Sequence, residues 1–181
     1  MADKYMLIEN IVGHIDLDFK IPLKKIMKEA VASDVPGVIY KVNEPQAAAL
    51  IFSSGKIVCT GTSSVGKAQD AINVILEKLR VRGVDAPATL EIKIDNITAA
   101  ARIQADLDLE ELGHSLHHCK YNSSLSALVC HIEDTGATIL LYSSGRILCT
   151  NTKTIESVHK SLEILKKDLE SVGVRVKQLL M

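Results

Sequence analysis

The pattern of hydrophobic and polar positions in the first half of the chain is repeated in the second half. Residues 47–61 and 137–151 are apolar stretches that each turn at a Ser-Gly pair, as β-hairpins do. The segments "VPGVIYKV" and "LSALVCHI", which precede these hairpins, also have a strand-like pattern. We therefore predict three or four antiparallel strands in each half of the chain.

Helical spacing of apolar residues accompanies the strands in both halves. An early helix is predicted from Leu23, Ile26 and Met27 in the first half, and from Leu109, Leu112 and Leu116 in the second. A longer amphipathic helix closes each half, with apolar stripes at Val65, Ala68, Ile72, Ile75, Leu76 and Leu79, and at Ile155, Val158, Leu162, Leu165, Leu169 and Val172. The turn-rich segment 81–88 joins the halves. We place the first repeat at residues 1–85 and the second at 86–181.

Two such units, each with one apolar sheet face, fuse most economically into one antiparallel sheet with the helices on one side, an α+β fold. Alternation along the hairpin directs Ile51, Ile57 and Cys59 toward the helices. The opposite face then carries Phe52, Ser54, Lys56, Val58 and Thr60, and in the second copy Tyr142, Ser144, Arg146, Leu148 and Thr150. A partly apolar face without a cover is a candidate binding surface.

The amino-acid composition indicates which binding partners and which cellular compartment to expect for this protein. The net charge is −1 and aromatic residues make up 3%, so bulk electrostatics do not indicate a nucleic-acid partner, although a local basic face is compatible with these numbers. The four cysteines lack CxxC spacing, which favours reduced thiols over a disulfide scaffold. The sequence has neither a run of 18 apolar residues nor a secretion signal, so we expect a cytoplasmic protein without a membrane partner.

Two motifs with possible chemistry have simpler interpretations. "GTSSVGKA" fits a phosphate-binding loop, but Ala68 replaces the hydroxyl residue that would hold Mg²⁺, which favours an ordinary strand-to-helix turn. "HSLHHC" brings histidines near Cys119, but no second ligand cluster is visible, and we expect a solvated helix end. We predict no catalytic residues, no metal and no cofactor, and hence not an enzyme.

The doubled segments "IENI" and "IDNI", "PGVIY", "LIFSSGKIVCTG" and "LLYSSGRILCT" resemble the TATA-box-binding protein family, and the archaeal form in particular. The resemblance extends from Ile8 to about Val172. It implies a saddle, one curved antiparallel sheet with helices on the convex side. The concave face of such a saddle lies in the DNA minor groove, and wedge residues bend the duplex, a family property that serves as a standard example of this mechanism. The implied function is a general transcription initiation factor that binds A·T-rich promoter DNA, recruits transcription factor B and RNA polymerase, and lies with the nucleoid.

The resemblance also assigns roles to residues. Asn10 and Asn96 stand where the family has its central asparagines, which suit the acceptor-only minor groove of A·T pairs. Thr60 and Thr150 supply hydroxyls beside them. Lys41, Lys56 and Arg146 are expected to reach phosphates, His131 replaces a usual arginine, and the apolar lining is Val12, Leu50, Val58, Thr98, Leu140 and Leu148. From the residues alone, the two asparagines can also be strand-end caps, and Phe52 and Tyr142 can also cover the edge of the core.

Departures from the family concern the wedges. Of the usual two phenylalanines per half only Phe52 is present, since Tyr142 stands at its repeat and Val35 and Leu125 stand at the other pair of positions. Smaller wedges unstack less, so we expect a weaker bend. The acidic stretch that would meet transcription factor B is not evident in "YNSSLSAL". We interpret the chain as a divergent member or paralogue. The alternative function is a protein-interaction module or regulator with weak or no TATA binding, and the open face also suits a homodimer of the free protein.

Overall fold

The computed structural model describes residues 6–23, 37–176 and 179–180. They form two compact units. The N-terminal unit is Asn10–Asp95, and the C-terminal unit is Asn96–Met181 together with Met1–Glu9. The repeat boundary that the sequence predicts between residues 85 and 86 stays a prediction.

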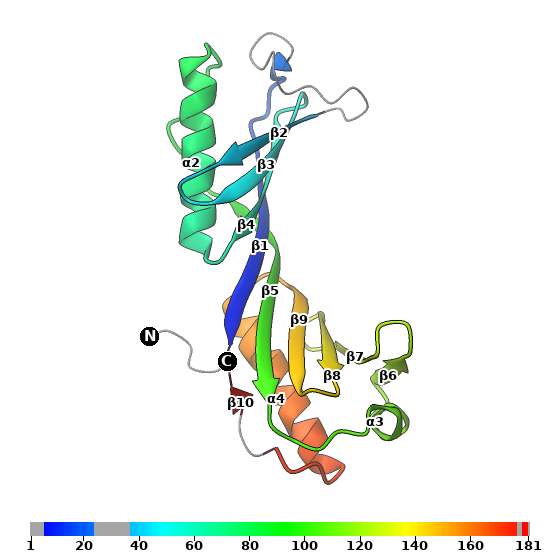
Figure 1. Ribbon diagram of the computed structural model, residues 1–181. Helices are drawn as coiled ribbons and strands as arrows, with labels where there is room; N and C mark the ends of the chain where they lie inside the picture. Colours follow the sequence, from blue (N-terminus) through cyan, green and yellow to red (C-terminus); the bar gives the residue numbers. More distant parts are fainter. Residues whose placement is uncertain (1–5, 24–36, 177–178, 181) are drawn as a thin grey trace. The chain divides into compact units, whose positions relative to one another are not determined.

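Each unit contains an antiparallel sheet (Figure 1). In the N-terminal unit the strand order is β2-β3-β4-β1, and in the C-terminal unit it is β6-β7-β8-β9-β5, with β10 paired to β5. The strands are β1 (Leu7–Asp16), β2 (Gly37–Val42), β3 (Ala47–Phe52), β4 (Lys56–Thr62), β5 (Lys93–Ile103), β6 (Cys119–Asn122), β7 (Ala127–Ile132), β8 (Ala137–Tyr142), β9 (Arg146–Thr152) and β10 (Leu179–Leu180).

Helices cover one face of each sheet (Figure 1). In the N-terminal unit α2 (Val65–Val81) packs on β4 and β2. In the C-terminal unit α4 (Ile155–Ser171) packs on β9 and β8, and α3 (Leu109–Ser115) packs on β6 and β7. The long helices begin alike, because Ser64 caps α2 by accepting from the Lys67 amide and Thr154 caps α4 by accepting from the Ser157 amide.

The core confirms the alternation predicted from the hairpins. Ile51, Ile57 and Cys59 are buried toward the helix side, as are their repeats. The Ser-Gly turns are also matched, since Gly55 and Gly145 both have positive φ and a Cβ on either would lie within 2.2 Å of a backbone oxygen. The repeat-related pair Gly61 and Asn151 has positive φ in both copies, with the two residue types that best tolerate it.

The predicted helices are correct in their centres and wrong at their ends. Five of the six stripe positions on α2 are buried, but Val65 is 40% exposed because it lies in the first turn. Val172 is 37% exposed and caps the end of α4. The early helix of the second half is α3, with Leu109, Leu112 and Leu116 buried. Of its counterpart in the first half, Leu23 is buried as predicted, whereas Ile26 and Met27 lie outside the described residues.

The expectation of four reduced cysteines is wrong. Cys119 begins β6 and lies directly opposite Cys130 on β7, and a disulfide joins them. The expected solvated helix end at "HSLHHC" is correct for His114 and Ser115, which are exposed where α3 ends, and wrong for Cys119, which is buried in β6. Only strand pairing brings these two cysteines together, so their spacing in the sequence could not indicate it. Cys59 and Cys149 are free and buried in the core, as expected.

The segment after α2 is held on that helix. The Gln69 side chain donates to the Leu90 carbonyl and accepts from the Ile92 amide, both at 2.9 Å. The Arg80 guanidinium donates to the Pro87 carbonyl. The turn-rich segment predicted at 81–88 is therefore an anchored connection. In the part of the chain described by the structure, no helix is long and apolar enough to cross a membrane.

Candidate nucleic-acid interface

We call the sheet face of each unit that lies away from its helices the open face. Its residues alternate with the buried core residues along each strand, so they are partly or fully exposed. The sequence-predicted residues found on it are Asn10, Val12, Lys41, Leu50, Phe52, Lys56, Val58 and Thr60 in the N-terminal unit, and Asn96, Thr98, His131, Leu140, Tyr142, Arg146, Leu148 and Thr150 in the C-terminal unit.

Asn10 on β1 is held in one orientation by the neighbouring strand. Its Oδ1 accepts from the Gly61 backbone amide at 2.8 Å, which identifies the oxygen because only an acceptor can face that N–H. The Thr60 hydroxyl lies 3.1 Å from both Oδ1 and Nδ2. Thr60 can accept from only one of the two Nδ2 hydrogens, so at least one N–H of Asn10 remains a donor without an acceptor among the described residues.

Asn96 on β5 repeats this arrangement in the C-terminal unit. Its Oδ1 accepts from the Asn151 backbone amide, again at 2.8 Å, and from the Thr150 hydroxyl at 3.2 Å. Its Nδ2 donates to the Thr98 hydroxyl at 3.3 Å, and Thr98 and Thr150 lie 3.2 Å apart. One face of each carboxamide thus supports the strand, as the capping interpretation requires. The other end presents an N–H donor, as the recognition interpretation requires.

Aliphatic side chains surround each asparagine. Leu50 pairs with Val58 across β3 and β4, and Leu140 pairs with Leu148 across β8 and β9. All four side chains are half-buried, so they form a smooth apolar surface and have little conformational freedom. The sequence interpretation missed Ile39, which lies opposite Leu50 on β2 and is 63% exposed. The signal was available, because Ile39 shares its strand parity with Lys41.

The candidate wedges differ between the units. Phe52 lies opposite Gly37, and a Cβ added at Gly37 would come within 3.3 Å of the Phe52 ring. Tyr142 lies opposite Ala127 instead. Leu125 is 50% exposed in the turn between β6 and β7. Val35 lies outside the described residues. Ser54 and Ser144 are exposed in the hairpin turns, where each hydroxyl accepts from the backbone amide two residues later at 3.4 Å.

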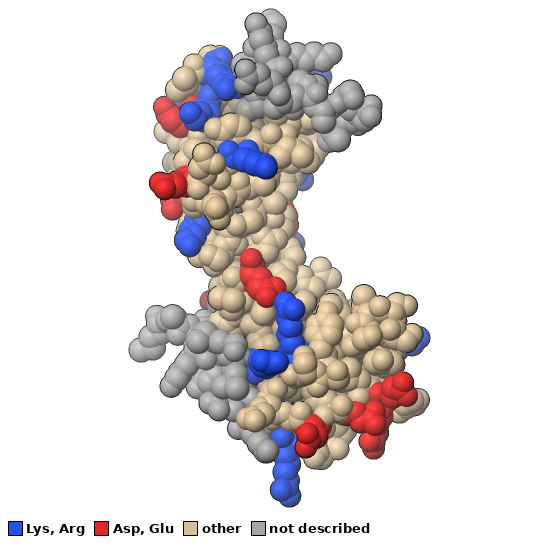
Figure 2. Space-filling model, in the orientation of Figure 1, with Lys and Arg blue, Asp and Glu red and all other residues tan. Residues whose placement is uncertain are grey.

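Charged groups of both signs lie on the open face of the N-terminal unit. Lys56 stands directly opposite Asp16. His14 lies between two carboxylates, with Nδ1 at 2.7 Å from Asp95 and Nε2 at 3.5 Å from Asp16. These carboxylates reduce the positive potential that Lys41 and Lys56 supply. Figure 2 likewise shows blue and red side chains interspersed on the face in view, without a continuous basic field.

The C-terminal unit is more basic at the matching place. Arg102 stands opposite Arg146 where the other unit has Asp16 opposite Lys56. Both arginines line a groove of about 370 Å³ with Leu7 and Ser144. Arg146 also lies 3.3 Å from the Glu9 carboxylate. Arg102 could not be predicted from the repeat, because its counterpart in the first half is Asp16 and the two halves share no cation at this position.

The chain is similar to known proteins over nearly its whole length. The family model described as "Transcription factor TFIID (or TATA-binding protein, TBP)" matches residues 6–81 and 91–172. The TATA-box-binding protein of Methanothermobacter thermautotrophicus is 35% identical over 96% of this chain and 99% of its own length. TATA-box-binding protein D of Halobacterium salinarum is 33% identical over 92% of this chain and 94% of its own.

A solved structure supports the same grouping. Methanococcus jannaschii TBP superposes with a TM-score of 0.84 and 26% identity, covering 92% of this chain and 99% of that one. This likeness confirms the fold class predicted from the sequence, an α+β fold of two repeats with a curved antiparallel sheet and helices on one side. The roles of the individual open-face residues stay predictions.

Proposed function

The chain belongs to the TATA-binding protein family, and on this premise we propose that it binds A·T-rich promoter DNA through the minor groove, bends it and so initiates transcription. The observation that carries the proposal is the matched pair Asn10 and Asn96. In both units a backbone N–H fixes the carboxamide oxygen at 2.8 Å and so directs an Nδ2 donor outward. The minor groove of A·T pairs offers only acceptors, N3 of adenine and O2 of thymine, which such donors suit.

The surroundings of the asparagines support groove binding rather than base reading in the major groove. The half-buried aliphatic side chains have no hydrogen-bond donors that would compete with the asparagines for the base acceptors. The amino group of guanine, which projects into the minor groove, would collide with this apolar surface. Phe52, Tyr142 and Leu125 are apolar or aromatic side chains at exposed strand ends and turns, where insertion between base steps is possible. Insertion of this kind bends a duplex.

Partners beyond DNA follow from the same premise. On this proposal the chain recruits transcription factor B and RNA polymerase, performs no catalysis, and lies with the nucleoid in the cytoplasm. The exposed apolar side chains of the open face, with Ile39 at 63% and Leu7 at 57%, favour pairing of two free copies through that face.

A second function is favoured by one observation, the carboxylates on the open face. Three carboxylates would repel a phosphate backbone. They are Asp16 opposite Lys56, Asp95 beside His14 and Glu9 beside Arg146. They suit a protein partner with basic groups. On this alternative the chain is a protein-interaction module or regulator that retains the fold and binds TATA DNA weakly or not at all.

A fluorescence titration separates the two functions. The full-length protein is titrated with a labelled TATA-containing duplex and with a G·C-rich duplex of equal length, at low and at physiological salt. We expect tighter binding to the TATA duplex that persists at physiological salt, because groove contacts add to the phosphate term. Equal affinity for both duplexes that disappears with salt, or no binding, contradicts promoter recognition and favours the regulator.

A further inference from the structure

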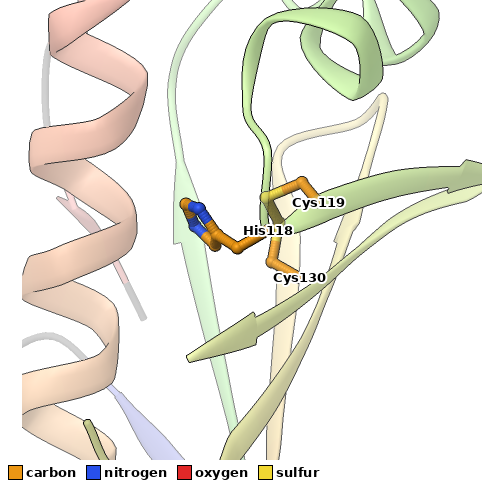
Figure 3. A group of neighbouring side chains, drawn as sticks. All are labelled: His118, Cys119 and Cys130. Atoms are coloured by element: carbon orange, nitrogen blue, oxygen red, sulfur yellow. A yellow bond between two sulfur atoms is a disulfide. The ribbon is translucent and has the colours of Figure 1, made fainter. Parts of the chain in front are cut away.

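Three potential metal ligands meet beside α4 in the C-terminal unit. A ring nitrogen of His118 and the sulfurs of Cys119 and Cys130 all lie within 4.8 Å of one another. Figure 3 shows the His118 ring beside the Cys119–Cys130 disulfide, on the side of the helix. Cys119 and Cys130 are 6% and 0% exposed, so the sulfurs lie in a site that holds little water.

A carboxylate lies beside one ring nitrogen of His118. Its Nε2 lies 3.1 Å from Oδ2 of Asp168 on α4. Both atoms are buried, and neither has a well-formed hydrogen bond among the described residues. A carboxylate beside one ring nitrogen is the usual support of a metal-bound histidine, because it fixes the ring and makes the other nitrogen a stronger ligand. An unsatisfied buried pair needs such an explanation.

The cluster of His118, Cys119 and Cys130 does not belong to the features that the two repeats share. The position of Cys130 in the first repeat is Tyr40, which lies at the equivalent register between Gly37 and Val42. The asparagines, threonines and hairpin glycines occur twice, whereas within residues 6–23, 37–176 and 179–180 the cluster is found in the C-terminal unit alone. Its role therefore concerns the C-terminal unit alone and does not follow from pseudo-symmetric groove binding.

Access is available from one side. A groove of about 670 Å³ is lined by His117, His118 and Cys119, together with His131 on β7 and Glu133 in the turn after it. The His118 side chain is 32% exposed. An ion can therefore reach the sulfurs without unfolding of the unit.

We propose that the reduced protein binds one Zn²⁺ through the thiolates of Cys119 and Cys130 and the ring nitrogen of His118 that faces away from Asp168. Two thiolates and a neutral imidazole balance the charge of the ion, and Zn²⁺ prefers this mixture of sulfur and nitrogen. A water completes the tetrahedron. The disulfide is the alternative, metal-free state of the same site.

The two states interconvert by a balanced reaction. A dithiol reductant gives two electrons and two protons to the Cys119–Cys130 bond, which breaks to two thiols while the reductant becomes a disulfide. Zn²⁺ then displaces the two thiol protons and binds both thiolates. The site joins β6 to β7 at the end of the hairpin away from Leu125, so both states keep these strands together.

Cobalt substitution tests the proposal directly. The full chain is reduced with a dithiol, freed from reductant without oxygen, and titrated with Co²⁺, whose thiolate charge-transfer and d–d absorption report a tetrahedral sulfur site. We expect saturation at one Co²⁺ per chain and loss of the bands when one Zn²⁺ is added. The oxidised protein is expected to show no such bands.

Variants identify the ligands. The double variant Cys119→Ser with Cys130→Ser abolishes the bands, His118→Gln weakens binding while leaving both thiols, and Asp168→Asn weakens it about 10- to 100-fold. Cys149→Ala removes a thiol outside the cluster and keeps the bands. Far-UV circular dichroism checks folding of each variant. The proposal is overturned if the reduced protein shows no thiolate band, if the double variant keeps it, or if His118→Gln binds like the unsubstituted chain.

Discussion

Replacement of Asn10 by aspartate tests the recognition role of the paired asparagines with little change in structure. Asn10→Asp keeps the Oδ1 acceptor that holds the Gly61 amide at 2.8 Å and the neighbouring Thr60 hydroxyl. It removes the Nδ2 donor and places a carboxylate where the N3 and O2 acceptors of an A·T groove would lie. The fold is expected to remain, while the proposed contact is reversed from attraction to repulsion.

The expected magnitude follows from the contacts of Asn10. At least one N–H is free for DNA, and loss of one neutral hydrogen bond costs about 0.5–1.5 kcal/mol. A carboxylate left unpaired against acceptors adds about 1–3 kcal/mol. The sum of about 1.5–4.5 kcal/mol corresponds to binding weaker by about 10- to 1,600-fold. Asn96→Asp is expected to behave alike, because its Oδ1 bond to the Asn151 amide is the same length.

The assay is fluorescence anisotropy with a labelled TATA duplex and a G·C-rich duplex at one salt concentration. Asn73→Asp on α2 is the matched control, since its Oδ1 accepts from Gln69 and Thr89 and it adds the same charge on the helix side. We expect only the Asn10 variant to lose its preference for the TATA duplex. Binding of Asn10→Asp within about threefold of the control would refute the reasoning, given that 1.4 kcal/mol is tenfold.

Three further predictions concern the wedge, the cations and a buried thiol. Phe52→Ala is expected to reduce the bend of a TATA duplex, seen as a smaller rise in end-to-end energy transfer; an unchanged rise would show that Phe52 does not insert. Arg102→Gln is expected to lower the slope of log affinity against log salt by about 0.9, whereas Lys78→Gln on α2 leaves it unchanged, and equal slopes for both variants would contradict a phosphate contact. Burial raises the pKa of the Cys149 thiol to about 11, against a weaker lowering by the Ser161 hydroxyl, so its protonated form stabilises the fold below pH 9 and this contribution is lost as pH rises toward 11. Urea unfolding from pH 8 to 11 should therefore show a steeper loss of stability for the unsubstituted chain than for Cys149→Ala, and parallel curves would be the contrary result.

The repeat made most of the fold predictable from the sequence. A hydrophobic pattern that occurs in both halves is supported by two independent stretches of sequence. Alternation that arises by chance in one half is recognised because the other half lacks it. The same logic located Asn10 and Asn96, and it explained Gly61 and Asn151 as two solutions to one positive-φ position. Features that occur in both halves could be predicted, because aligning the two halves of the sequence does not require knowing how the strands pair.

Features that break the symmetry were missed for the same reason. Arg102 has Asp16 as its repeat, so comparison of the halves gave no signal for a cation there. The Cys119–Cys130 disulfide depends on the register of β6 against β7, and β6 has no counterpart among the described strands of the N-terminal unit. Exposure at the helix ends, as for Val65, depends on where the sheet stops, which periodicity cannot specify.

The most direct test of minor-groove recognition is a titration with an inosine-substituted duplex. Replacing each A·T pair of the TATA element by an inosine·cytosine pair gives the major groove the pattern of G·C pairs, while the minor groove keeps only acceptors because inosine lacks the guanine amino group. If Asn10 and Asn96 read the minor groove, the protein binds this duplex within a few-fold of the TATA duplex and far more tightly than the G·C duplex. Affinity equal to that of the G·C duplex would contradict the account.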